Sequence, residues 1–150
     1  METRILEPLS AIGQLVVRDV VTVEATASLR EVAKVMREAN VSSVLVGSDR
    51  TIATERDLAR ALASGLGPDD AVADVASAHP IRVPARTPVV DGAALMLNQG
   101  VRHLVVAFPD RDAVVSLRDV MAVLLQATDP HLWLTQLRVA VGAPAEIWLG

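Results

Sequence analysis

The sequence predicts an α/β (α+β) protein made of two tandem β-α-β-β-α repeats, and three observations carry this prediction. Residues 23–47 align with residues 83–107 at an offset of 60, with six identities in 25 positions. Each half contains a helix-start signal followed by apolar residues at helical spacing. A valine-rich run follows each of these helices, at 41–46 and at 101–106. The order of elements therefore repeats although identity between the halves is low.

In the first half, a strand is expected at 20–23. Ser28 and Glu31 have the spacing of a capping box, so the first helix is expected to begin there. It should run to about Ala39, because Asn40 is suited to the left-handed residue that ends a helix. The remaining elements of this half are expected to be strands at 41–46 and 51–54 and a helix from Thr54 to Gly65.

The second half repeats this order from a strand at 81–83. Thr87 followed by Pro88 predicts a cap residue and a proline at the first helical position. This helix should run to about Gln99, with Gly100 as its left-handed stop. The remaining elements of this half are expected to be strands at 101–106 and 113–116 and a helix that reaches Ala127.

These elements divide the chain into repeat 1 (10–66), repeat 2 (67–128) and a C-terminal extension (129–150). A turn-rich stretch at 65–70 joins the repeats. The extension contains both tryptophans, Trp133 and Trp148, and an apolar pattern that suits a short helix. It either packs on the module or its dimer mate, or it is a docking segment for another protein.

Composition excludes several classes of function. Hydrophobic residues make up 51% of the chain and aromatic residues only 2%, so the core must be aliphatic. A net charge of -4 with scattered basic residues gives no support for a nucleic-acid partner. The chain has no cysteine, and no apolar run approaches the roughly 18 residues of a spanning helix. We therefore expect a cytoplasmic protein that binds neither nucleic acid nor membrane.

One short motif occurs once in each half, after a strand and at a helix start. It reads Thr54-Glu55-Arg56-Asp57 in the first half and Ser116-Leu117-Arg118-Asp119 in the second. Hydroxyl and carboxylate at this spacing form a capping box, which is the simplest interpretation. The same carboxylate can also accept hydrogen bonds from two vicinal hydroxyls, such as those of a ribose. Two equivalent occurrences favour a ligand-binding role in addition to capping.

The order of elements and the repeated motif resemble a pair of CBS domains, the Bateman module, over residues 10–127. The resemblance implies that the repeats pack through their sheets about a pseudo-twofold axis. It also implies two clefts that bind adenosine nucleotides or S-adenosylmethionine. Asp57 and Asp119 would then be the ribose-binding carboxylates, and Thr54 and Ser116 their hydroxyl partners.

The resemblance extends to further cleft positions. In the first strand of each repeat these positions are Thr22 and Arg82. At the start of the second strand they are Val41, Ser42 and Ser43 in repeat 1 and Val101, Arg102 and His103 in repeat 2. Because some relatives hold phosphates with a neighbouring His and Arg there, the second cleft is expected to prefer a phosphorylated ligand.

The expected function is a stand-alone regulatory sensor of an adenosine-containing ligand, with AMP, ADP, ATP and S-adenosylmethionine as candidates. The alternative is a structural or scaffold module that binds no such ligand. No catalytic or metal-binding constellation is evident, so we expect a non-enzyme that requires no cofactor. The predicted helices 89–99 and 117–127 are apolar on many faces, which predicts a homodimer that pairs through them.

Overall fold

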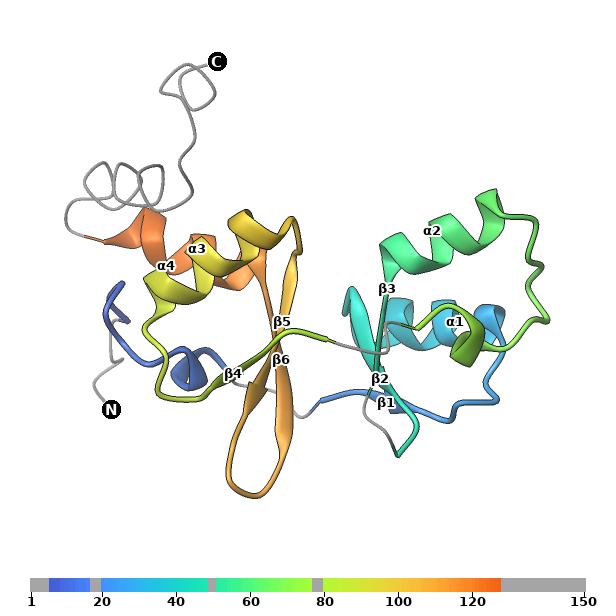
Figure 1. Cartoon of the computed structure of the whole chain (residues 1–150), viewed down its shortest axis with the longest axis horizontal. Helices are drawn as coiled ribbons and strands as arrows, with labels where there is room; N and C mark the ends of the chain where they lie inside the picture. The colour runs from blue at the N-terminus through green and yellow to red at the C-terminus, as the bar shows by residue number, and fades with distance from the viewer. Residues whose placement is uncertain (1–5, 17–19, 49–50, 77–79, 128–150) are drawn as a thin grey trace, which may run out of the picture. The chain divides into compact units, whose positions relative to one another are not determined.

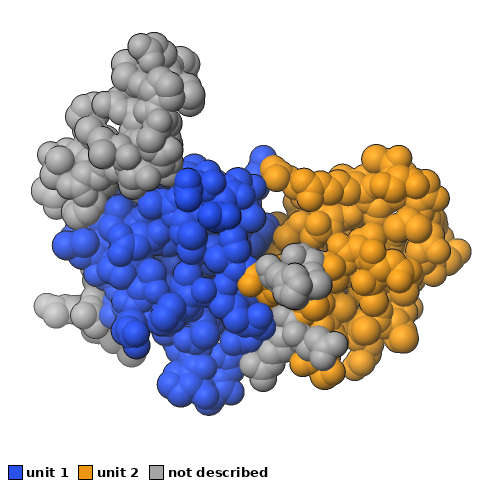
Figure 2. Space-filling model, in the orientation of Figure 1, with its two compact units in different colours: residues 1–18, 81–150 blue, residues 19–80 orange. Residues whose placement is uncertain are grey.

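The structure is a computed structural model that describes residues 6–16, 20–48, 51–76 and 80–127. The chain divides into two compact units. One unit consists of the chain from Asp19 to Pro80, and the other combines the segment before Asp19 with the segment that starts at Ile81 (Figure 2). Each unit has its own sheet and its own hydrophobic core.

The unit of residues 19–80 contains repeat 1. Its main elements are β1 (Thr22–Val23), α1 (Leu29–Ala39), β2 (Ser43–Val46), β3 (Thr51–Thr54) and α2 (Glu55–Ala63). The strands form a mixed sheet in the order β1-β2-β3, with β1 parallel and β3 antiparallel to β2. Both helices lie on the same side of this sheet (Figure 1). The predicted β-α-β-β-α order is confirmed.

Repeat 2 has the same order and the same mixed sheet. Its main elements are β4 (Arg82–Pro84), α3 (Val89–Gln99), β5 (His103–Ala107), β6 (Asp112–Ser116) and α4 (Leu117–Gln126). Strands β4 and β5 are parallel, and β5 and β6 are antiparallel (Figure 1). The pseudo-twofold packing of the two repeats concerns the placement of one unit relative to the other and stays a prediction.

The cores are aliphatic, as the composition requires. In repeat 1, Val32 and Met36 of α1 and Val44 of β2 are buried together in one cluster. In repeat 2, Met96 and Leu104 occupy the same places and are fully buried. Burial of such side chains is the main favourable term in the stability of each unit.

Most predicted helix ends are confirmed. The Ser28 hydroxyl accepts from the Glu31 N–H at 3.1 Å, and the Glu31 carboxylate accepts from the Ser28 N–H at 2.9 Å. Asn40 and Gly100 both adopt the left-handed conformation, with φ of 53° and 65°. The strands β2 and β5 begin two residues later than predicted, since the N–H groups of Val41 and Val101 instead close the preceding helices.

The predicted start of α3 is wrong. Pro88 is the cap residue, no side chain caps this helix, and the first helical residue is Val89. The reason is tertiary: the N–H groups of Val89 and Val90 donate to the carbonyls of Ser10 and Pro8, both at 2.9 Å. A distant segment therefore satisfies the donors that a Thr87 side chain was expected to cap.

That distant segment reveals an exchange between the repeats. Residues 8–16 precede β1, the first strand of repeat 1, but pack in the unit of repeat 2, where Ile12 is fully buried. Residues 68–76 precede β4, the first strand of repeat 2, but pack in the unit of repeat 1, where Val72 is fully buried. The Ile12 N–H donates to the Thr87 carbonyl at 2.7 Å, and the Val72 N–H donates to the Ala27 carbonyl at 2.8 Å. This exchange was not predicted from the sequence, and the boundaries 10–66 and 67–128 stay a prediction.

Candidate ligand sites at two strand–helix junctions

The first candidate site is the junction between β3 and α2. The Thr54 N–H and the Thr54 hydroxyl both donate to Asp57 Oδ2, at 2.9 and 3.0 Å. The Asp57 N–H donates to Thr54 Oγ1 at 3.3 Å, which completes a capping box. This arrangement fixes the rotamers of both side chains at the end of a strand, where the next helix begins.

The second candidate site, between β6 and α4, has nearly the same geometry. The Ser116 N–H and hydroxyl donate to Asp119 Oδ2 at 3.0 and 2.9 Å. The Asp119 N–H donates to Ser116 Oγ at 3.3 Å. The two predicted motifs therefore form equivalent local structures, one in each unit.

One oxygen of each carboxylate remains available. Among the residues that the structure describes, Oδ1 of Asp57 and Oδ1 of Asp119 have no hydrogen-bond partner. Each oxygen lies at a helix start, where backbone N–H groups of the first turn favour anions and polar ligands. Each junction can thus accept at least one further hydrogen bond from a ligand hydroxyl without breaking the cap.

The sheet register brings other predicted residues to these junctions. Ser43 lies directly opposite Thr54, and His103 lies directly opposite Ser116. The neighbouring pairs, 42 with 55 and 102 with 117, are hydrogen-bonded, because Glu55 and Leu117 donate their N–H groups to the carbonyls of Ser42 and Arg102 at 3.1 and 2.7 Å. The Ser43–Thr54 and His103–Ser116 pairs are therefore non-hydrogen-bonded pairs, in which side chains come closest.

Val41 and Val101 have structural roles in the described chain. Both side chains pack against the core of their unit, and both N–H groups donate to the last turn of the preceding helix at 3.0 Å. They position the residues that follow them, Ser42 and Arg102, beside the junctions.

Thr22 and Arg82 are not brought to the junctions. Thr22 lies opposite Leu45, and Arg82 lies opposite Val105, so each is two residues along the sheet from the junction row. Arg82 Nη2 donates to Asp112 Oδ2 at 2.9 Å. Asp112 begins β6 and Ser116 ends it, about 14 Å away at about 3.4 Å per residue. This ion pair was not predicted from the sequence, because it joins β4 to β6 across the intervening strand β5.

A third capping box provides an internal comparison. Ser28 and Glu31 cap α1 with the same reciprocal bonds, but Ser28 follows a loop instead of a sheet strand. At Ser28 the hydroxyl accepts from the Glu31 N–H, and no bond from this hydroxyl to the Glu31 carboxylate occurs among the described residues. The hydroxyl-to-carboxylate bond is therefore shared by the two strand–helix junctions and absent from this third box.

The residues that the structure describes contain no cluster of His, Asp and Glu that could hold a metal ion. None of their helices has the length and apolar character needed to cross a membrane.

The sequence matches the model of a known domain family. The CBS domain model matches twice, over residues 12–64 and 72–126, which cover both repeats and both junctions. The chain belongs to the CBS-domain family. It is a tandem CBS pair, and the predicted resemblance is confirmed.

Two curated relatives of this CBS pair are archaeal proteins described as uncharacterized. One, from Methanopyrus kandleri, is 30% identical over 121 residues, which are 75% of this chain and 62% of that protein. The other, a 17.7 kDa protein from Acidianus ambivalens, is 32% identical over 141 residues, which are 90% of this chain and 80% of that protein. The chain thus spans about 62% of the length of the Methanopyrus kandleri relative.

Solved structures agree with the fold. A CBS domain protein from Pyrobaculum aerophilum, complexed with AMP, is 28% identical with a TM-score of 0.69, over 84% of this chain and 98% of that one. The CBS domain pair of protein MJ0100, in complex with 5′-methylthioadenosine and S-adenosylmethionine, is 19% identical with a TM-score of 0.68, over 77% of this chain and 95% of that one. Because the MJ0100 pair is only 19% identical, its similarity supports the fold and nothing further.

Proposed function

We propose that this CBS pair is a regulatory module that binds an adenosine-containing ligand at its two strand–helix junctions. The observation that carries the proposal is the free Oδ1 of Asp57 and of Asp119, each beside a helix start and on a carboxylate whose other oxygen is already held. A carboxylate held in this way can accept from a ribose hydroxyl, and the Pyrobaculum aerophilum relative complexed with AMP supports this ligand class. AMP, ADP, ATP and S-adenosylmethionine are the candidate ligands.

The two junctions differ in the residues that lie opposite the motif. Ser42 and Ser43 stand at the first junction, whereas Arg102 and His103 stand at the second. A guanidinium and an imidazole can both donate to phosphate oxygens, and serine hydroxyls suit a less charged ligand. The second junction is therefore proposed to prefer the phosphorylated ligand.

Signalling would follow from the position of the motif at the first turn of α2 and of α4. A ligand bound to Asp57 or Asp119 contacts the start of a helix, so occupancy can shift the packing of that helix without any catalytic step. The module would pass this shift to a partner or to its own homodimer. Leu125, which is 60% exposed on α4, supports a dimer surface on repeat 2, and light scattering should then report a dimer at micromolar concentration.

A structural module remains a second candidate. The specific observation in its favour is the Ser28–Glu31 box, which has the same reciprocal capping bonds but does not lie at a strand–helix junction. A capping box can therefore occur in this chain for a purely structural reason. If all three boxes only cap helices, their carboxylates should be interchangeable in every assay.

A thermal-shift screen of AMP, ADP, ATP and S-adenosylmethionine separates the two candidates. A ligand at a hundredfold excess over Kd stabilises the native state by about 2.7 kcal/mol. Asp57→Asn and Asp119→Asn keep the size of the side chain and an acceptor for the cap. Each should still weaken binding by about 1 to 1.5 kcal/mol, the difference between a charge-assisted hydrogen bond and the neutral one that replaces it. At about 1.4 kcal/mol per tenfold, that is about one power of ten in Kd.

Glu31→Gln is the matched control, since it changes the same cap chemistry at α1. It should lower the unliganded melting temperature about as much as the two Asp variants and leave every ligand-induced shift unchanged. The sensor proposal fails if no ligand moves the melting temperature, or if the Asp variants respond to ligand as Glu31→Gln does.

The phosphate preference has its own test. The double variant Arg102→Ser, His103→Ser gives the second junction the residues of the first. The ratio of AMP affinity to adenosine affinity, measured by titration calorimetry, should fall at least tenfold. An unchanged ratio would remove Arg102 and His103 from the proposed phosphate contacts and leave the ribose contact to be judged by the Asp variants.

A further inference from the structure

Segments 8–16 and 68–76 are bound to their units by the same set of backbone hydrogen bonds. Four such bonds between described residues hold each segment, and each bond in one unit has its counterpart at an offset of 60 in the other. At this offset Ile12 corresponds to Val72, and both side chains are fully buried. In the unit of repeat 2, the four bonds run from the N–H groups of Ile12, Gly13, Val89 and Val90 to the carbonyls of Thr87, Ala85, Ser10 and Pro8, at 2.7 to 2.9 Å.

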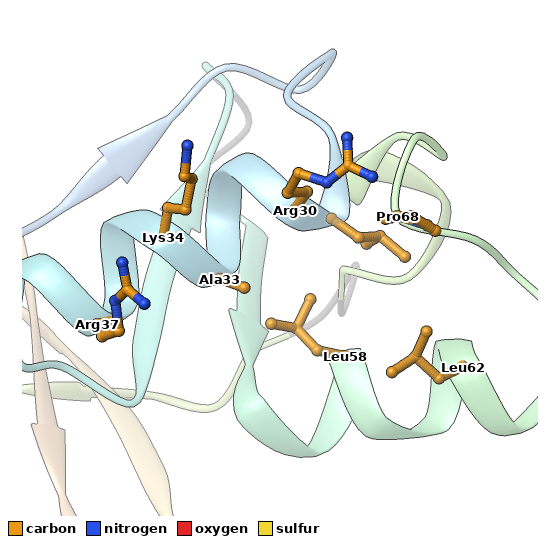
Figure 3. Close-up of a pocket in the computed structure, with 8 residues that line it drawn as sticks. Arg30, Ala33, Lys34, Arg37, Leu58, Leu62 and Pro68 are labelled. Carbon is orange, nitrogen blue, oxygen red and sulfur yellow. The ribbon is translucent and has the colours of Figure 1, made fainter.

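In repeat 1 the start of α1 has a second support. Its first N–H groups donate to segment 68–76, as the Arg30 N–H does to the Pro68 carbonyl at 3.0 Å. Figure 3 shows these two residues together at this end of α1. The capping box of Ser28 and Glu31 adds two bonds from side chains of the same turn. Helix α1 therefore keeps a cap of its own when segment 68–76 moves away.

In repeat 2 the start of α3 lacks this second support. The offset of 60 places Pro88 at the position of Ser28, and no described side chain caps α3. The first four residues of α3 are Val, Val, Asp and Gly, whereas those of α1 are Leu, Arg, Glu and Val. Valine, aspartate and above all glycine are weaker helix formers than leucine, arginine and glutamate. The first turn of α3 therefore depends on its contacts with segment 8–16.

Ile12 is the anchor of that segment. A Cβ on Gly92, in the first turn of α3, would lie only 2.6 Å from Ile12 Cδ1. The absence of a side chain at this position thus lets the isoleucine reach the helix directly. Repeat 1 has Val32 at the position of Gly92, so this close approach is a property of repeat 2.

The far end of α3 leads to the second junction. The Val101 N–H closes the last turn of α3, and the next residue, Arg102, accepts from the Leu117 N–H at 2.7 Å. His103 then lies opposite Ser116 in the sheet. Helix α3 has 11 residues and is about 16 Å long at about 1.5 Å per residue. A short helix packed in a core is a rigid element, and such an element can carry a change from one end to the other.

We propose that Ile12 is a positioning residue for the second junction. It holds segment 8–16 on the start of α3, and α3 in turn sets the positions of Arg102 and His103. This inference rests on the proposed function, in which those two residues give the second junction its preference for a phosphorylated ligand. Loss of the Ile12 anchor frays the first turn of α3 and lowers that preference. The first junction has no such dependence, because α1 keeps its own cap.

The test compares the affinities of full-length variants for AMP and for adenosine by titration calorimetry. Ile12→Ala should lower the ratio of AMP affinity to adenosine affinity at least about fivefold, the lower end of typical couplings between sites. A side chain that only fills the core would lower the melting temperature and leave this ratio unchanged in the folded protein.

A new capping box provides a rescue. Pro88→Ser together with Asp91→Glu gives α3 the residues of the α1 box, because these positions correspond to Ser28 and Glu31. Pro88 already has the extended backbone of a cap residue, with φ of -59° and ψ of 141°. Added to Ile12→Ala, the box should restore most of the affinity ratio, although the cavity left by Ile12 still lowers the melting temperature. Core packing alone would not separate the two quantities.

Val72→Ala is the matched control, since Val72 is the fully buried counterpart of Ile12 in segment 68–76. It should lower the melting temperature and leave the affinity ratio unchanged. The proposal is overturned if Ile12→Ala leaves the ratio unchanged, if Val72→Ala lowers it as much, or if the new capping box does not restore it.

Amide hydrogen exchange tests the link without any ligand. In Ile12→Ala, or in Ile12→Val if the alanine variant does not fold, exchange should be faster at both ends of α3. The amides concerned are those of Val89 and Val90 at its start and of Val101 and Leu117 at its far end. Faster exchange at the start alone would mean that the start of α3 does not position its end, and would overturn the proposal. If the wild type binds neither AMP nor adenosine, the proposed function fails, and this exchange experiment still decides whether α3 connects segment 8–16 to the junction.

Discussion

Replacing Ile12 by Ala tests the exchange of segments most directly. Ile12 precedes β1 of repeat 1 in the sequence, yet it is fully buried in the core of repeat 2. Its Cδ1 fills the space over Gly92, where a Cβ would lie only 2.6 Å away. Removal of this side chain should therefore destabilise repeat 2, although Ile12 and Val89, the first residue of α3, are 77 positions apart in the sequence.

The cost follows from the burial. Ile→Ala removes the equivalent of three methylenes, which at about 0.8 kcal/mol each amounts to about 2.4 kcal/mol of lost transfer energy. The cavity adds to this cost, since Gly92 has no side chain that could move into the space. We expect a loss of about 3 to 4 kcal/mol in the free energy of unfolding, within the roughly 2 to 5 kcal/mol typical of buried sites.

Urea denaturation followed by far-UV circular dichroism measures this loss. Leu9→Ala is the matched control, because Leu9 lies in the same segment but is 67% exposed, and it should cost less than about 0.5 kcal/mol. Amide hydrogen exchange should show that the effect is local. The amides of Val89 and Val90, which donate to the carbonyls of Ser10 and Pro8, should exchange faster in Ile12→Ala. If the two variants lost the same free energy of unfolding, or if amide hydrogens exchanged faster in α1 instead of α3, the packing of residues 8–16 in the unit of repeat 2 would be refuted.

Three further substitutions probe the same units. Gly92→Ala should gain about 1 kcal/mol of helix propensity and lose about 1 to 3 kcal/mol to overpacking against Ile12. Urea titration should therefore show a net loss of stability. The double variant with Ile12→Val should recover this loss. The Arg82–Asp112 pair should contribute less than about 1 kcal/mol in a double-mutant cycle and less at 1 M NaCl, because the Arg82 side chain is 39% exposed; an energy independent of salt would contradict this interpretation. Gly100→Ala should cost about 1 to 2 kcal/mol of stability, measured by thermal denaturation. Gly100 has a φ of 65°, and a Cβ there would meet no atom within 4 Å, so the cost is backbone strain alone. An unchanged melting temperature would be inconsistent with this conformation.

Much of the fold and of the candidate site was predictable because the signals are local. A capping box links residues three apart, so Ser28, Thr54 and Ser116 each mark a helix start regardless of what packs around them. The pairing of Ser43 with Thr54 and of His103 with Ser116 also follows from short connections between neighbouring antiparallel strands. The predicted residues Thr22 and Arg82 lie away from the junctions because a parallel strand is positioned by its crossover helix, whose length sets the register.

The predicted C-terminal extension, with Trp133 and Trp148, lies outside the described residues. Its two interpretations, packing on the module or docking another protein, stay predictions. So do the homodimer and the pairing surface on α3 and α4.

The sequence by itself determined the two β-α-β-β-α repeats, the two hydroxyl–carboxylate junctions and the difference between Ser42–Ser43 and Arg102–His103. These features depend on periodicity and on contacts within a few residues. Only the tertiary structure decided that Pro8 and Ser10 satisfy the start of α3, that Ile12 belongs to the second core, and that Leu62 of α2 stays exposed while Leu124 of α4 is buried. Those outcomes depend on which distant surfaces can bury apolar area and satisfy free N–H groups together, and no local pattern of residues encodes that choice.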